Sequence, residues 1–145
     1  MKLKELLVNI CNISIKEKLV QSAMSGTSLY NINPKSVKFY PLLFASPTGQ
    51  HIIKEHTTTF TITLYYFDRL LEDLSNDIDI YSTAIEELKN IVKAIENLQG
   101  VLKVNDQWRC TNFNDTESFN DALAGAWCTI EIVTDNETEC QIISE

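Results

Sequence analysis

The feature that most constrains this chain is a change of hydrophobic period between residues 57 and 98. From residue 60 to residue 66 every second side chain is large and apolar, with threonine or tyrosine between. This alternation predicts a half-buried antiparallel strand over residues 57–67. From residue 78 to residue 98 apolar side chains recur every three or four positions instead. That spacing predicts an amphipathic helix of about five turns.

The ends of this helix are also marked in the sequence. Asn76 is placed to cap the first turn, and Asp77 and Asp79 lie where the helix dipole favours acidic residues. Gly100 follows in the position that often ends a helix.

The first half of the chain predicts shorter elements. Helical spacing of apolar residues predicts a short amphipathic helix over residues 2–11. Alternation of Ile13 and Ile15 with polar residues predicts a short strand, and residues 22–28 read as a loop. An extended piece over residues 37–45 precedes a turn signal at residues 46–49.

The last third predicts strands. Residues 101–104 and 107–111 form a strand pair or one bent strand, residues 112–121 a polar connection, and residues 124–133 a final strand. Strands on both sides of one long helix, without alternation of strand and helix, predict an α+β fold. We expect one domain over residues 1–145, with an antiparallel sheet packed against the long helix and a short N-terminal helix.

Two segments of this domain are expected to extend from its body. One is an extended hairpin arm at residues 34–58, and the other is an acidic C-terminal tail at residues 134–145.

Length and charge exclude several classes of protein. One domain accommodates 145 residues, and 44% hydrophobic residues supply a sizeable core. A net charge of −8 and only two arginines argue against nucleic-acid binding as the main function. The opening residues lack the apolar segment of a signal peptide, and no run is long enough for a membrane span. We therefore expect a soluble chain, made in the cytosol, whose four scattered cysteines are reduced.

The histidines do not predict a metal site. His51 and His56 flank Glu55 in a spacing one residue longer than the inverted zinc-protease motif. On a strand these two side chains point to opposite sides, so we expect them on an exposed hairpin. The sequence also lacks nucleotide-binding glycine loops and a nucleophile motif. We predict no metal, no cofactor and no catalytic residues.

Carboxylates gather where the long strand meets the long helix. They are Asp68, Glu72, Asp73, Asp77 and Asp79. The favoured interpretation is capping and a solvated face, and the alternatives are an acid/base pair or a cation site. A third interpretation is that Arg69 pairs with an acidic group of a neighbouring subunit.

A ladder of threonines forms the polar face of the long strand. Thr57, Thr59, Thr61 and Thr63 are uncharged and favour β structure. We expect this ladder to lie at a sheet edge, where it would invite pairing with another chain.

Residues 65–76, which read YYFDRLLEDLSN, are followed by IYST at residues 80–83 and by AGAW at residues 124–127. This pattern resembles small neck and tail proteins of crAss-like bacteriophages. The order of elements also resembles the tail-terminator family of tailed phages. The motifs cover residues 60–85 and 122–133, less than a third of the chain, whereas the order of elements covers nearly all of it.

The resemblance implies a non-enzymatic virion protein. It implies a homo-oligomeric ring, with which six- or twelve-fold symmetry is consistent, stacked on adjacent neck, tail or portal proteins. Genomic DNA would only pass through the lumen, and the virion would be the location of the assembled protein. Interface candidates are Asp68, Arg69, Asp73, Asn76, Thr59, Thr61, Thr63, His51 and His56. The alternatives are a protein-binding adaptor, such as a tail assembly chaperone, and a small hydrolase using Asp68 and Asp73.

Overall fold

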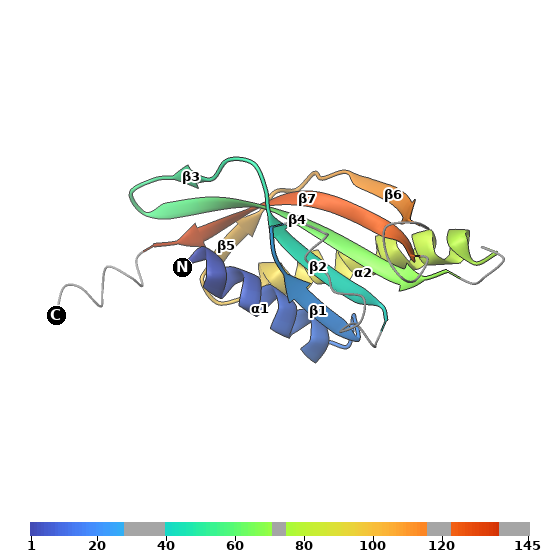
Figure 1. The fold of residues 1–145 in the computed structure, drawn as a ribbon. Helices are drawn as coiled ribbons and strands as arrows, with labels where there is room; N and C mark the ends of the chain where they lie inside the picture. Colours follow the sequence, from blue (N-terminus) through green and yellow to red (C-terminus); the bar gives the residue numbers. More distant parts are fainter. Residues whose placement is uncertain (28–39, 71–74, 116–122, 137–145) are drawn as a thin grey trace.

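A mixed sheet of seven strands forms the centre of the molecule (Figure 1). The structure, a computed structural model, describes residues 1–27, 40–70, 75–115 and 123–136. The helices are α1 (Leu3–Lys16) and α2 (Asp77–Glu96). The strands are β1 (Ser22–Ser25), β2 (Leu42–Pro47), β3 (Ile52–Ile53), β4 (Thr57–Arg69), β5 (Val101–Val104), β6 (Cys110–Asp115) and β7 (Leu123–Asp135).

Two long strands organise the sheet. β4 and β7 have 13 residues each and pair antiparallel along their whole length, from Thr57 opposite Asp135 to Arg69 opposite Leu123. The sheet order is β1-β2-β4-β7-β5. β3 pairs with β4 beyond the end of β2, and β6 pairs with β7 on the part that β5 does not cover. Each long strand therefore has partners on both sides.

The main core lies between the sheet and the two helices. α1 packs against β1 and β2, and α2 packs against β4, β5 and β7. Alternate residues of the long strands supply the sheet side of this core, because successive side chains of a strand point to opposite faces. They include Ile62, Leu64, Cys128, Ile130 and Ile132, all fully buried.

A second, smaller core lies on the opposite face of the sheet. Leu42, Phe44, Phe67 and Leu123 are buried there, with Phe113 packed against them. The rings of Phe67 and Phe113 meet edge to face, with centroids 4.9 Å apart. Gly125 lies between these two residues in the strand register. A Cβ atom on Gly125 would collide with the backbone carbonyl of Tyr66, so this close approach requires glycine.

The structure confirms the α+β domain and its strongest elements. The predicted strand at residues 57–67 lies within β4, the predicted helix within 78–98 corresponds to α2, and the predicted strand at 124–133 lies within β7. Gly100 has a positive φ of 89°, but it does not end the helix as predicted, because α2 ends at Glu96 with Asn97 as its C-cap residue. Asn76 is the N-cap residue of α2 and Asp77 and Asp79 lie in its first turn, as predicted, but the Asn76 side chain makes no capping hydrogen bond.

The N-terminal predictions need correction. α1 extends to Lys16, so Ile13 and Ile15 belong to a helix of 14 residues and the expected strand there is wrong. Residues 22–25, expected in a loop, form β1. β1 pairs parallel to β2, which makes the sheet mixed, not purely antiparallel.

The later connections also differ from expectation. β5 and β6 do not pair with each other, because both pair with β7. Residues 112–115, expected in a connection, belong to β6. β7 continues through Asp135, so the expected tail cannot begin at residue 134, and residues 137–145 of that tail lie outside the described residues. Residues 42–47, expected in the arm, form the almost wholly buried strand β2.

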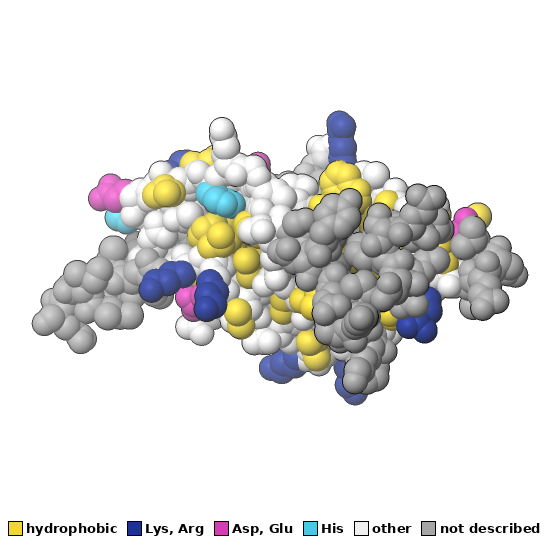
Figure 2. Space-filling view, in the orientation of Figure 1, with side chains coloured by type: hydrophobic (Ala, Val, Ile, Leu, Met, Phe, Trp, Pro, Cys, Tyr) yellow, Lys and Arg dark blue, Asp and Glu magenta, His cyan; other side chains and the backbone are white. Residues whose placement is uncertain are grey.

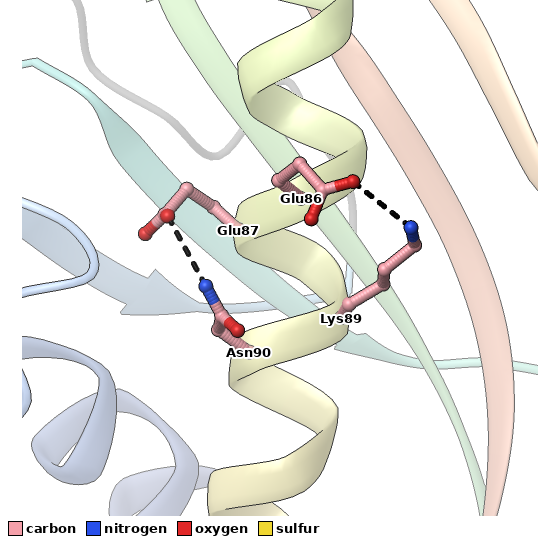
Figure 3. A network of polar contacts seen from close by, with 4 residues as sticks. All are labelled: Glu86, Glu87, Lys89 and Asn90. Atoms are coloured by element: carbon pink, nitrogen blue, oxygen red, sulfur yellow. Dashed lines mark hydrogen bonds and ion pairs between the residues drawn. The ribbon is translucent and has the colours of Figure 1, made fainter.

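The outer face of α2 is polar. Lys89 Nζ lies 2.9 Å from Glu86 Oε1, and Asn90 Nδ2 donates to Glu87 Oε1 at 3.3 Å (Figure 3). Such pairs on an exposed helix face contribute a few tenths of a kcal/mol each. In the ranges given above, no helix combines the length and apolar character that a membrane span requires.

Candidate functional site

The clearest candidate site is the second part of the predicted arm. From here on, "hairpin arm" means residues 48–56 only. This segment connects β2 to β4 and contains β3. Gly49 turns the chain with a positive φ of 68°. Thr48 N donates to Thr61 O at 3.0 Å, and Thr61 Oγ1 donates to Gln50 O at 2.9 Å. These bonds tie the first half of the arm to β4.

The far end of the arm is held by Asn136, the residue that follows β7. Lys54 N donates to Thr57 O at 2.8 Å, closing the turn. Asn136 N donates to His56 O at 2.9 Å, and Asn136 Nδ2 donates to Lys54 O at 3.3 Å. Thr58 Oγ1 in turn donates to Asn136 Oδ1 at 2.9 Å. The arm is therefore held in a defined position, although all of residues 49–56 are exposed.

Two isoleucines make the arm apolar where solvent reaches it. Ile53 is 80% exposed and Ile52 is 52% exposed. Lys54 and Glu55 follow directly and are also exposed. Figure 2 shows hydrophobic, histidine and acidic side chains close together in this upper-left region of the molecule. Exposed apolar groups rimmed by charges are typical of protein contact sites.

The structure places both histidines on the arm, as the sequence predicts. His51 Nδ1 accepts a hydrogen bond from Thr61 N at 3.2 Å, and its ring packs edge to face on Phe60 with centroids 5.5 Å apart. His56 Nε2 lies 3.9 Å from Glu55 Oε1. Throughout the described parts of the chain, no three His, Cys, Asp or Glu side chains are grouped to hold a metal ion.

The threonine ladder does not lie at a sheet edge, so that prediction is wrong. β4 is an internal strand, with β2 and β3 on one side and β7 on the other. Thr63 is buried, and its hydroxyl is bonded to those of Thr48 at 2.8 Å and Thr129 at 2.9 Å. Thr59 and Thr61 are partly exposed. The ladder joins neighbouring strands of one chain.

Asp68 and Arg69 lie at the end of β4. Asp68 Oδ1 accepts a hydrogen bond from Arg69 N at 2.7 Å. The Arg69 guanidinium lies 5.2 Å from the centroid of the Tyr40 ring, within the range of a cation–π interaction. Asn76 Nδ2 donates to Arg69 O at 3.3 Å and so connects the start of α2 to β4. The structure thus brings these three predicted residues together.

The remaining predicted carboxylates do not form one described cluster. Asp77 Oδ1 accepts a bond from Ile78 N at 2.7 Å, a local contact at the start of α2. Asp79 is exposed. Glu72 and Asp73 lie outside the described residues. Burial, with the charges of Asp68 and Glu87, raises the pKa of the nearby Tyr66 hydroxyl, which keeps it protonated.

Sequence reasoning missed an apolar groove between α1 and the end of β1. It has a volume of about 300 Å³. We call it the α1–β1 groove, and it is lined by Leu3, Lys4, Leu7, Val8, Ser25, Gly26, Thr27 and Pro47. The sequence predicted a loop at residues 22–28, so no strand was expected beside the N-terminal helix and the groove between them was not predicted.

Sequence reasoning also missed a pocket containing both tryptophans of the chain. Its volume is about 490 Å³, and it is lined by Gln107, Trp108, Arg109, Thr111, Trp127 and Thr129. Residues 105–109 connect β5 to β6 there. Asn105 Oδ1 accepts from Glu131 N at 2.8 Å, and Asn105 Nδ2 donates to Gln107 O at 2.8 Å. The adjacent Trp108 and Arg109 were a signal in the sequence, since both types are frequent in binding sites.

Comparison with known proteins adds no family assignment. No protein-family model matches the sequence, and no curated protein matches it.

Proposed function

We propose that this protein is a structural component of a tailed-phage virion, forming a ring in the neck or tail around the DNA channel. The observation that carries the proposal is the hairpin arm, an anchored projection with two exposed isoleucines at its end. When a partner covers a side chain as exposed as Ile53, apolar surface leaves water and the complex is stabilised. A rigid apolar projection fits a protein whose mechanism is assembly.

The charge of the chain supports the same function. The net charge is −8, and DNA carries a dense row of phosphates. A ring of acidic subunits repels those phosphates, so DNA can pass through its lumen without binding to the wall. The resemblance to neck and tail-terminator proteins points in the same direction.

Electron microscopy with light scattering tests this proposal. We expect closed rings with a central hole at high protein concentration, and the same chain in purified phage particles. A chain that is absent from particles and never forms closed rings would contradict the proposal and favour the adaptor. The mass measured at low concentration, where the chain is monomeric, is the reference from which the number of copies in an assembly is calculated.

A further inference from the structure

We infer that the hairpin arm of one copy occupies the α1–β1 groove of the next copy, with Ile53 as the inserted side chain. This inference rests on the proposed ring and names the contact that would build it.

The arm has the form of a projecting knob. Ile53 and Ile52 are consecutive on a two-residue strand, so their side chains point to opposite faces. Their register partners are Thr58 and Thr59, and β3 lies beyond the end of β2. In Figure 1 β3 lies at the upper left of the sheet, whereas α1 and β1 lie below it. The knob and the groove are therefore different surfaces of the chain.

The groove has the size and chemistry to receive the knob. Leu3, Leu7, Val8 and Pro47 give it a largely apolar lining, and its volume is about 300 Å³. An apolar cavity of roughly 150 Å³ already holds a benzene molecule, so the groove has room for isoleucine. Val8 is itself 45% exposed, which leaves apolar surface for a partner to cover.

Charges beside the two surfaces are complementary. Lys4 lines the groove and is exposed. On the arm Lys54 and Glu55 directly follow Ile53, and both are exposed. The groove thus offers a positive side chain, Lys4, and the arm offers a negative one, Glu55, close to its apolar centre. Opposite charges in this arrangement fix the register of two partners.

The contact would join unlike surfaces, so it is a head-to-tail contact. A row of copies joined in this way has a free arm at one end and a free groove at the other. Repeating such a contact produces a ring when the rotation between copies closes, and a filament when it does not. An arm that bound another arm would instead stop at a dimer.

Two complementary variants test the direction of the contact. Ile53→Asp disables the arm and keeps the groove, whereas Val8→Asp disables the groove and keeps the arm. Sedimentation up to about 1 mM protein gives the association constant. We expect each variant to associate at least about 30-fold more weakly than wild type, since a buried charge replaces a central apolar contact. The equimolar mixture should form a heterodimer and nothing larger.

Matched controls separate association from folding. Ile78→Asp changes an isoleucine that is 74% exposed on neither surface, and it should associate like wild type. Lys4→Glu and Glu55→Lys should each weaken association, and the double variant should restore it. Circular dichroism of all variants checks that they fold.

The outcomes distinguish this inference from the proposed function. Rings that persist in Ile53→Asp and Val8→Asp would overturn the inference and leave the proposed ring. Wild-type protein that stays monomeric, or a mixture that gives no heterodimer, would also overturn it. Arm-dependent chains that never close would support the contact and contradict the ring.

Discussion

Gly125 lies where β7 approaches β4 too closely for any larger residue. A Cβ atom there would meet the carbonyl of Tyr66, and the Phe67 and Phe113 rings meet across the same position. We expect Gly125→Ala to lower the free energy of unfolding by about 3 kcal/mol, because the two central strands must separate. Urea unfolding measures this change.

Gly49→Ala is the control for that variant. Gly49 has a positive φ of 68°, unlike Gly125, and open space surrounds the position of a Cβ atom there. Its cost is therefore backbone strain alone, about 1 kcal/mol. Equal losses in the two variants would show that the close approach at Gly125 is not what requires glycine.

The raised pKa of the Cys128 thiol predicts that the protein loses stability in alkaline solution. Burial, and secondarily the charge of Cys110, raises the pKa of the Cys128 thiol from 9.0 to about 12. An acid whose pKa is raised by folding stabilises the fold below its unfolded pKa, and this contribution is lost as pH rises toward the folded pKa. From about pH 8 to about pH 10.5 the loss is roughly 2 kcal/mol.

Cys128→Ala removes this titration. We expect its free energy of unfolding to fall roughly 2 kcal/mol less than that of wild type over the same pH interval, measured with urea. Cys11, whose pKa burial raises to about 11, titrates in both proteins and cancels in the comparison. Parallel pH profiles would contradict the assignment.

At the scale of elements, Asn105 holds the connection between β5 and β6, residues 105–109, against β7. Its side chain replaces a missing strand partner by accepting from Glu131 N and donating to Gln107 O. We expect Asn105→Ala to cost about 1–2 kcal/mol, because the Glu131 amide loses its acceptor. Hydrogen exchange at that amide should accelerate. Asn112→Ala, on the exposed side of β6, should change stability by less than about 0.5 kcal/mol.

The elements that the sequence predicts well are those whose periodicity reflects burial. β4 and α2 each bury one regular face, for example Ile62 and Leu64 on the strand and Leu88 and Ile95 on the helix. β1 could not be recognised because its four residues, SAMS, carry little hydrophobic signal. Its parallel pairing with β2 depends on tertiary contacts alone. Ile13 and Ile15 mimicked a strand because so short an alternation also fits a helix.

The candidate site was predictable only in part. The turn signal at residues 46–49 and the histidines indicated a hairpin arm over residues 34–58, and the structure has a hairpin only over its second part, residues 48–56. The sequence could not show that residues 42–47 are buried in the sheet, since that follows from pairing with β1 and β4. The groove needs α1, β1 and Pro47 in contact, which no local pattern encodes.

For the whole molecule, the arrangement of the two cores predicts cooperative unfolding. Leu42 and Leu43 are neighbours on β2 but belong to opposite cores, as do Tyr66 and Phe67 on β4. Neither core can open without disturbing the strands of the other. We expect tryptophan fluorescence and far-ultraviolet circular dichroism to give coincident urea transitions. Separate midpoints for the two probes would show that unfolding is not one cooperative transition.

The connection that begins at Asn105 also bears on how the protein avoids aggregation. It divides the strand line beside β7 into a piece of four residues and a piece of six. A long, flat rim of unpaired backbone groups templates the growth of amyloid-like sheets, and a break of this kind disrupts the template. This rim can therefore remain in contact with solvent at high protein concentration, and specific side-chain contacts are left to select the partners.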